Sequence, residues 1–99
     1  MIKHVILWKI KDEIENKESH KLLAKKALEE LKGKIEGLID ITVNTSPLPT
    51  SNCDMMLDSS FESFEALKAY AIHPLHQAAA DNFVRPITSE RVCMDYEVE

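Results

Sequence analysis

Residues 2–10, Ile-Lys-His-Val-Ile-Leu-Trp-Lys-Ile, decide the fold of this chain. The run is rich in β-branched and aromatic residues, which predicts a β-strand. Side chains alternate between the two faces of a strand, so the even-numbered residues, including His4 and Trp8, share one face. The other face carries Val5 and Leu7 at its centre. Because both faces are apolar at the centre, we expect both to be covered by other parts of the structure.

The residues that follow predict a helix and two strands. Apolar residues recur at helical spacing up to about Lys34, with Asn16 or Ser19 as the capping residue and glycines at the end. A strand is predicted over residues 38–45, with Ile39, Ile41 and Val43 on one face. A turn-rich loop over residues 46–52 then leads to a third strand over residues 53–61.

Two short helices and a last strand complete the pattern. Ser63 is a good N-cap for the first of these helices, which should break at His73 because a residue before proline disfavours the helical conformation. Pro74 suits the start of the next helix, which we expect to run to about Phe83. Clean alternation over residues 91–99 predicts the final strand.

The predicted order, β-α-β-β-α-β, indicates a single α+β domain over residues 1–99 with a ferredoxin-like antiparallel sheet. Helices then cover one face of the sheet and leave the other face open. Since the first strand is apolar on both faces, we predict that a second copy of the chain covers the open face, sheet against sheet, and forms an α/β barrel.

Composition and charge exclude several classes of function. The chain has 99 residues, 44% of them hydrophobic, and a net charge of −5, which is unfavourable for binding nucleic acid. No apolar run approaches the ~20 residues of a membrane span, and no signal-peptide core is present. Cys53 and Cys93 form no pairing pattern, so we expect reduced thiols. The sequence therefore predicts a cytoplasmic protein with neither nucleic acid nor membrane as a partner.

Four stretches resemble the stress-responsive A/B barrel (Dabb) family. They are residues 2–13, residues 60–63, residues 69–76 with the His-Pro-x-His segment that is most recognisable in the family, and residues 95–97, Asp-Tyr-Glu. The chain departs from many members at Glu36, where they have proline. The resemblance covers the whole chain and implies a homodimeric α/β barrel of two ferredoxin-like subunits, in a family whose members mostly have no established activity.

The resemblance also implies a candidate site. Plant olivetolic acid cyclase, an enzyme with this fold, closes a linear polyketide by an aldol reaction. Its catalytic tyrosine and histidine correspond to Tyr70 and His76, and a histidine of its pocket corresponds to His4. A further pocket histidine falls on Met55, and this difference puts the transfer of substrate and activity in doubt.

The residue types support the same chemistry independently. Ring closure needs a base for an acidic C–H bond and a hydrogen-bond donor for the enolate oxygen, and His76 and Tyr70 can supply them. If Pro74 opens a helix, His76 lies in its first turn, where the helix dipole favours the neutral imidazole that a base requires. A structural role is the alternative, in which the histidines cap helices and His4 is an interior hydrogen-bonded residue.

Neither a metal nor a cofactor is predicted. His73 and His76 are three residues apart, but Pro74 between them interrupts a regular helical face. A pocket between sheet and helices, with Trp8 and Phe83 in its wall beside His73, would suit a small apolar ligand. Two functions remain open: a dimeric Dabb protein that binds such a ligand without catalysis, or a cofactor-independent enzyme related to polyketide cyclases or monooxygenases that uses His76 and Tyr70.

Overall fold

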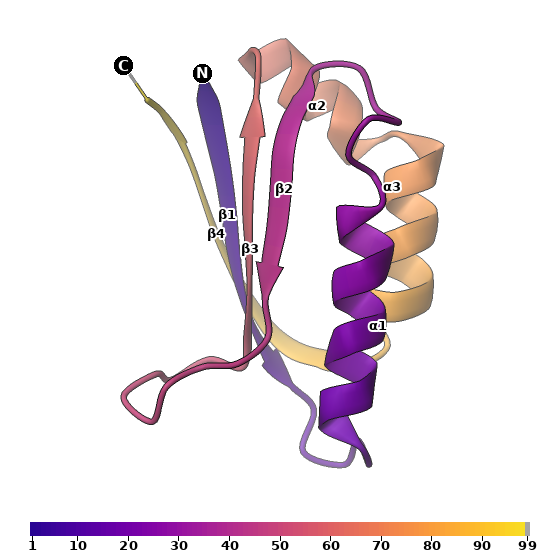
Figure 1. Cartoon of the computed structure of the whole chain (residues 1–99), viewed down its shortest axis with the longest axis vertical. Helices are drawn as coiled ribbons and strands as arrows, with labels where there is room; N and C mark the ends of the chain where they lie inside the picture. The colour runs from indigo at the N-terminus through magenta and orange to yellow at the C-terminus, as the bar shows by residue number, and fades with distance from the viewer. Residues whose placement is uncertain (99) are drawn as a thin grey trace.

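The computed structural model describes residues 1–98 and contains the predicted order of elements, with a π-helical turn, η1, that extends the third helix (Figure 1). In chain order the elements are β1 (Ile2–Ile10), α1 (Lys17–Glu29), β2 (Leu38–Asn44), β3 (Met55–Phe61), α2 (Phe64–Ala71), α3 (Pro74–Ala79), η1 (Ala80–Val84) and β4 (Thr88–Glu97). The strands form one antiparallel sheet in the order β2-β3-β1-β4, with all helices on one side. The ferredoxin-like fold is confirmed.

The ends of several elements differ from the prediction. The third strand begins at Met55 and the last at Thr88, while the predicted end of the last strand at Glu99 lies outside the described residues. Asn16 precedes α1 in a left-handed conformation, with φ 56°, and its side chain makes no capping hydrogen bond. Ser19 lies inside the helix, where its hydroxyl donates to the Asn16 carbonyl. The predicted side-chain cap on α1 is therefore wrong.

Strand β2 differs from simple alternation at its start. The pairing of β2 with β3 shifts between Leu38 and Asp40, which is the mark of a β-bulge. As a result Leu38 and Ile41 are both buried, whereas Ile39 is 43% exposed. The prediction that Ile39 shares the buried face is wrong, because the extra residue at the bulge turns its side chain outward.

The core lies between the sheet and the helices. The even-numbered residues of β1 face the helices, and Ile6, Trp8 and Ile10 are each 5% exposed. They pack with buried residues of the helices, among them Leu28 and Leu67. This face of β1 is covered within a single chain, as the alternation predicts.

The join between α2 and α3 follows the predicted signals. Ser63 accepts a hydrogen bond from the backbone N–H of Ala66 at 3.1 Å and so caps α2. The Nδ1 atom of His73 accepts from the N–H of Leu75 at 3.1 Å, immediately before Pro74 opens α3. This tight break between the helices places residues of both around one space beneath the sheet.

The opposite face of the sheet is exposed and apolar at its edge. Val92 and Met94 of β4 are 62% and 67% exposed, and they pair across strands with Leu7 and Val5 of β1. Val5 and Leu7 themselves are only partly buried. Nothing within residues 1–98 covers this face. Separately, none of the described helices has the length and apolar character to span a membrane.

Candidate functional site

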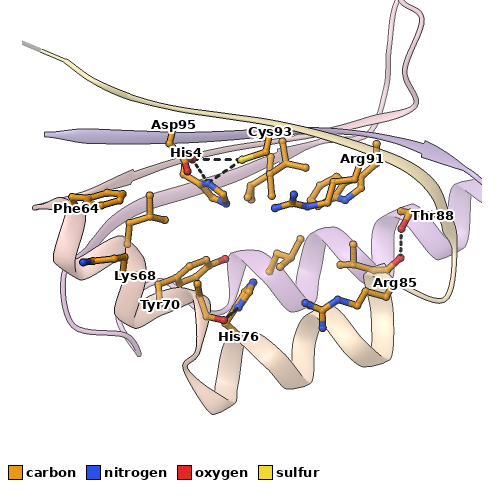
Figure 2. A pocket seen from close by; sticks show the side chains of 18 residues that line it. His4, Phe64, Lys68, Tyr70, His76, Arg85, Thr88, Arg91, Cys93 and Asp95 are labelled. Carbon is orange, nitrogen blue, oxygen red and sulfur yellow. Dashed lines mark hydrogen bonds and ion pairs between the residues drawn. The ribbon is translucent and has the colours of Figure 1, made fainter.

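A cavity of about 700 Å³ lies between the sheet and the helices (Figure 2). Its wall is apolar in part, with side chains of Ile6, Leu57 and Leu67. His4 projects into the space from the sheet, while Tyr70 and His76 enter it from α2 and α3. Apolar walls with a few convergent polar groups are typical of small-molecule sites, and the volume lies in their usual range.

Tyr70 presents a buried hydroxyl without a partner. The residue is 1% exposed, and its ring packs against that of Phe61 at a centroid distance of 4.9 Å. Within residues 1–98 the hydroxyl oxygen has no hydrogen-bond partner. Burial raises the pKa of this phenol well above its ordinary value, so it stays protonated near neutral pH and can act only as an uncharged donor or acceptor.

His76 lies against Tyr70, with 4.2 Å between ring centroids. Burial lowers the pKa of His76, and the guanidinium of Arg85 lowers it further, although a hydrogen bond to the Ala71 carbonyl acts in the opposite direction. The Nδ1 atom lies 3.1 Å from that carbonyl oxygen, which can only accept. Nδ1 therefore carries the proton in the neutral ring, and Nε2 is left with a free lone pair.

His4 occupies the sheet side of the cavity. It lies opposite Asp95 in the pairing of β1 with β4, and its Nδ1 atom is 2.5 Å from the Asp95 carboxylate. The hydroxyl of Ser59 donates to the His4 carbonyl, which fixes the backbone. Its ring lies 6.3 Å from that of Tyr70, so three polar side chains face one space. As in His76, the Nδ1 atom of His4 faces an acceptor and Nε2 is left for the cavity.

His4, Asp95 and Cys93 together form the group that could hold a metal ion. Their candidate ligand atoms lie within 4.8 Å of one another, with the Cys93 sulfur 3.6 Å from Nδ1 of His4. A nitrogen, sulfur and oxygen donor set is compatible with Zn²⁺. Sequence spacing could not predict this cluster, because the pairing of β1 with β4 brings together residues that are about 90 positions apart.

The structure brings four of the seven predicted site residues to the cavity. His4, Trp8, Tyr70 and His76 line it. The other three lie elsewhere: Met55 is 1% exposed in the core, His73 caps α3, and Phe83 on η1 is 39% exposed. The capping bond of His73 is the structural role that we considered for this segment.

Sequence reasoning missed three basic residues at the cavity, Lys68, Arg85 and Arg91. They are the only lysines or arginines after Lys34, in a chain with 12 in total. Their separation from the other nine basic residues, which all lie within the first 34 positions, was the only feature that set them apart in the sequence. No local pattern linked them to one another.

Comparison with known proteins agrees with this geometry. Several solved structures to which the chain is similar are described as dimeric ferredoxin-like proteins. The family model of the stress-responsive A/B barrel domain, Dabb, matches residues 2–98. The chain belongs to this family.

Individual relatives extend the comparison. The chain is 35% identical to the uncharacterized protein SCO4036 of Streptomyces coelicolor over 80 residues, or 79% of this chain and 81% of that protein. It is similar to a dimeric protein of unknown function from Bacteroides fragilis, with 31% identity, a TM-score of 0.90 and coverage of 98% and 95% of the two chains. A hydroxynitrile lyase from Passiflora edulis shares the fold, at 16% identity, a TM-score of 0.75 and coverage of 99% and 93%.

Proposed function

We propose that this Dabb protein is an enzyme that transfers protons on a small carbonyl compound in the cavity, as in the first step of an aldol-type reaction. One observation carries the proposal: the partnerless hydroxyl of Tyr70 and the ring of His76 both line one cavity. A buried hydroxyl without a hydrogen bond destabilises the fold, and a functional role for Tyr70 would account for this cost. A bound oxygen atom would give it a partner.

His76 acts as the base in this proposal. Its lowered pKa keeps the imidazole neutral at neutral pH, and the bond from Nδ1 to Ala71 directs the lone pair to Nε2. Nε2 takes a proton from the carbon next to the carbonyl group of the ligand. The electron pair of the broken C–H bond forms the C=C bond of the enolate, while the π pair of the carbonyl moves to its oxygen.

Tyr70 stabilises the charge that develops on that oxygen. Its raised pKa keeps the proton on the hydroxyl, which donates a hydrogen bond to the enolate. His4, held by Asp95, faces the same space and can orient a second polar group of the ligand. In a complete aldol step the enolate carbon attacks another carbonyl carbon, and the new alkoxide receives the proton from His76.

The fold is compatible with this function, because the Passiflora edulis protein that shares it is named as a lyase. At 16% identity the likeness shows the fold alone, so the support comes from the residues of this chain. The two cysteines are unpaired in the structure, as expected for the reducing cytoplasm that we propose as its location.

The experiment is hydrogen–deuterium exchange at the α-carbon of ketone probes in D₂O, followed by proton NMR. The panel includes acetophenone and 4-oxo-4-phenylbutanoate. We expect the protein to accelerate exchange of at least one probe over buffer, and the variants His76→Ala and Tyr70→Phe to lose most of the acceleration. Tyr96→Phe is the matched control, because Tyr96 is the other tyrosine of the chain and does not line the cavity.

Two outcomes would contradict the proposal. The first is exchange no faster than in buffer for every probe. The second is acceleration that survives in both His76→Ala and Tyr70→Phe, which would place the chemistry elsewhere. In either case the chain would remain a Dabb protein, and its cavity could still bind a ligand without catalysis.

We also propose that the chain forms a homodimer through the exposed face of the sheet. The Bacteroides fragilis relative is described as dimeric, and so are further solved structures of this fold. In this chain Val92, Met94 and Tyr96 of β4 form an exposed apolar strip beside the half-buried Val5 and Leu7. An exposed apolar face of this kind is typical of an interface.

A further inference from the structure

We propose that the ligand of the cavity is an anion, a small organic molecule with a carboxylate group, which Arg91 and Arg85 bind from opposite walls. The inference rests on the proposed use of the cavity as a binding site and defines the class of compound that enters it. It departs from the uncharged apolar ligand that the sequence suggested.

The first argument is the distribution of charge. The chain has 17 acidic and 12 basic residues, so a cavity wall of average composition would carry more acidic than basic side chains. The wall of this cavity instead carries three cationic side chains, Lys68, Arg85 and Arg91, and one carboxylate, Asp95. The Asp95 carboxylate is hydrogen-bonded to His4. The cavity is therefore positive in a protein that is negative overall.

The second argument is the position of the two arginines. Arg91 lies on β4 opposite Trp8 of β1, on the sheet wall, and Arg85 follows η1 on the helix wall (Figure 2). His76 lies on the helix wall between Tyr70 and Arg85 in the same view. A carboxylate between the two guanidiniums would hold the rest of the molecule near Tyr70 and His76.

The third argument concerns the partners of these cations. No carboxylate of residues 1–98 forms an ion pair with Arg91 or Lys68. Arg85 pairs with Asp81, but both side chains are more than half exposed, and exposed pairs of this kind contribute little. Arg91 is thus available to a ligand, whereas Arg85 would exchange its exposed hydrogen bonds to Asp81 and Gln77 for bonds to the ligand. Arginine binds carboxylates through two parallel hydrogen bonds.

The field of these groups reaches the reacting residues. After burial, the charges of Arg85 and Arg91 contribute to the lowered pKa of His76. A carboxylate bound between these arginines would offset part of their field, so an anion in the cavity also acts on the proposed base.

The test compares matched ligands that differ only in charge. The probes are 4-oxo-4-phenylbutanoate, its neutral primary amide and the corresponding pairs with shorter and longer chains, titrated against the intact protein by calorimetry and NMR. A hydrogen bond to a charged group is stronger than one to a neutral group, so we expect an acid to bind at least about tenfold more tightly than its amide. We expect this preference to decrease between about 50 and about 500 mM salt.

Variants locate the effect. Arg91→Gln and Arg85→Gln should each reduce the preference for the acid by about tenfold and leave the affinity for the amide unchanged. Lys34→Gln removes one positive charge from outside the cavity and serves as the matched control. It should leave the preference intact, since a surface charge at a distance is screened.

Three outcomes would overturn the inference: equal affinity for every acid and its amide, a preference that survives in both arginine variants, or no binding of any acid. The proposed chemistry is tested separately by isotope exchange. A preference for acids in the Tyr70→Phe variant, which should lack exchange activity, would support anion binding even if the wild-type protein exchanged no probe.

Discussion

Replacing Tyr70 with phenylalanine should stabilise the protein and abolish most of its activity. The change removes one oxygen atom that is buried and has no hydrogen-bond partner within residues 1–98, while the ring that packs on Phe61 stays in place. A buried polar group without a partner costs about 1–3 kcal/mol in desolvation. We therefore expect the free energy of unfolding to rise by about 1 kcal/mol or more.

The two effects are measured on the same sample. For a domain of this length, about 1 kcal/mol corresponds to a shift in Tm of about 4–8 °C, which scanning calorimetry resolves at a fixed protomer concentration. Exchange activity should fall about 10²–10³-fold, as expected for the loss of a donor to an oxyanion. The Tyr96→Phe control, outside the cavity, should leave activity intact.

The opposite sign of the stability change would refute the reasoning. If Tyr70→Phe lowered Tm by several degrees, the hydroxyl would have to make a structural hydrogen bond in the folded protein. The functional argument from a partnerless hydroxyl would then fail. Stabilisation without a loss of activity would refute the proposed role of Tyr70 as a donor but leave its structural description correct.

Three further predictions concern the base, the interface and a glycine. Because the pKa of His76 is lowered and its neutral form is the base, kcat/KM should be flat near pH 7 and fall only at a pH below 6.5, the ordinary pKa of histidine, and His76→Gln should remove activity throughout. Met94→Glu should yield monomers in light scattering, because it places a charge on the exposed apolar face. Gly37→Ala should cost about 2–4 kcal/mol in urea denaturation, since φ is +86° and the new Cβ would lie 2.5 Å from Cβ of Ala66. Gly33→Ala, at φ +83° with open space around it, should cost only about 1 kcal/mol and shows how much of the effect is backbone strain.

Local signals in the sequence were sufficient for the fold. The alternation in residues 2–10, the Ser63 cap and the break before Pro74 each specify a conformation through neighbours in the chain, and all three are confirmed. One local signal was wrong, the side-chain cap predicted for α1. The error in β2 occurs where the decisive contact is distant. The exposure of Ile39 depends on a register shift against β3, which alternation along β2 alone does not reveal.

The candidate site was predictable only in part, for the same reason. The resemblance pointed to Tyr70 and His76, and they meet at one cavity. The partners of His4 depend on the pairing of the first strand with the last, so spacing along the chain carries no signal for Asp95. The hydroxyl without a partner is a property of the packed interior, and no pattern of residue types encodes it.

The first strand connects the proposed enzyme to the proposed dimer. Its even-numbered residues place His4 and Trp8 in the cavity, while its odd-numbered residues place Val5 and Leu7 on the open face of the sheet. A shift in pairing of one residue would exchange these two faces, so the register of β1 determines both functions at once. Because the faces point apart, a substitution on one should leave the chemistry of the other unchanged unless it alters the register. The dimer can therefore cover the apolar face while the cavity beneath the helices stays accessible to an anion.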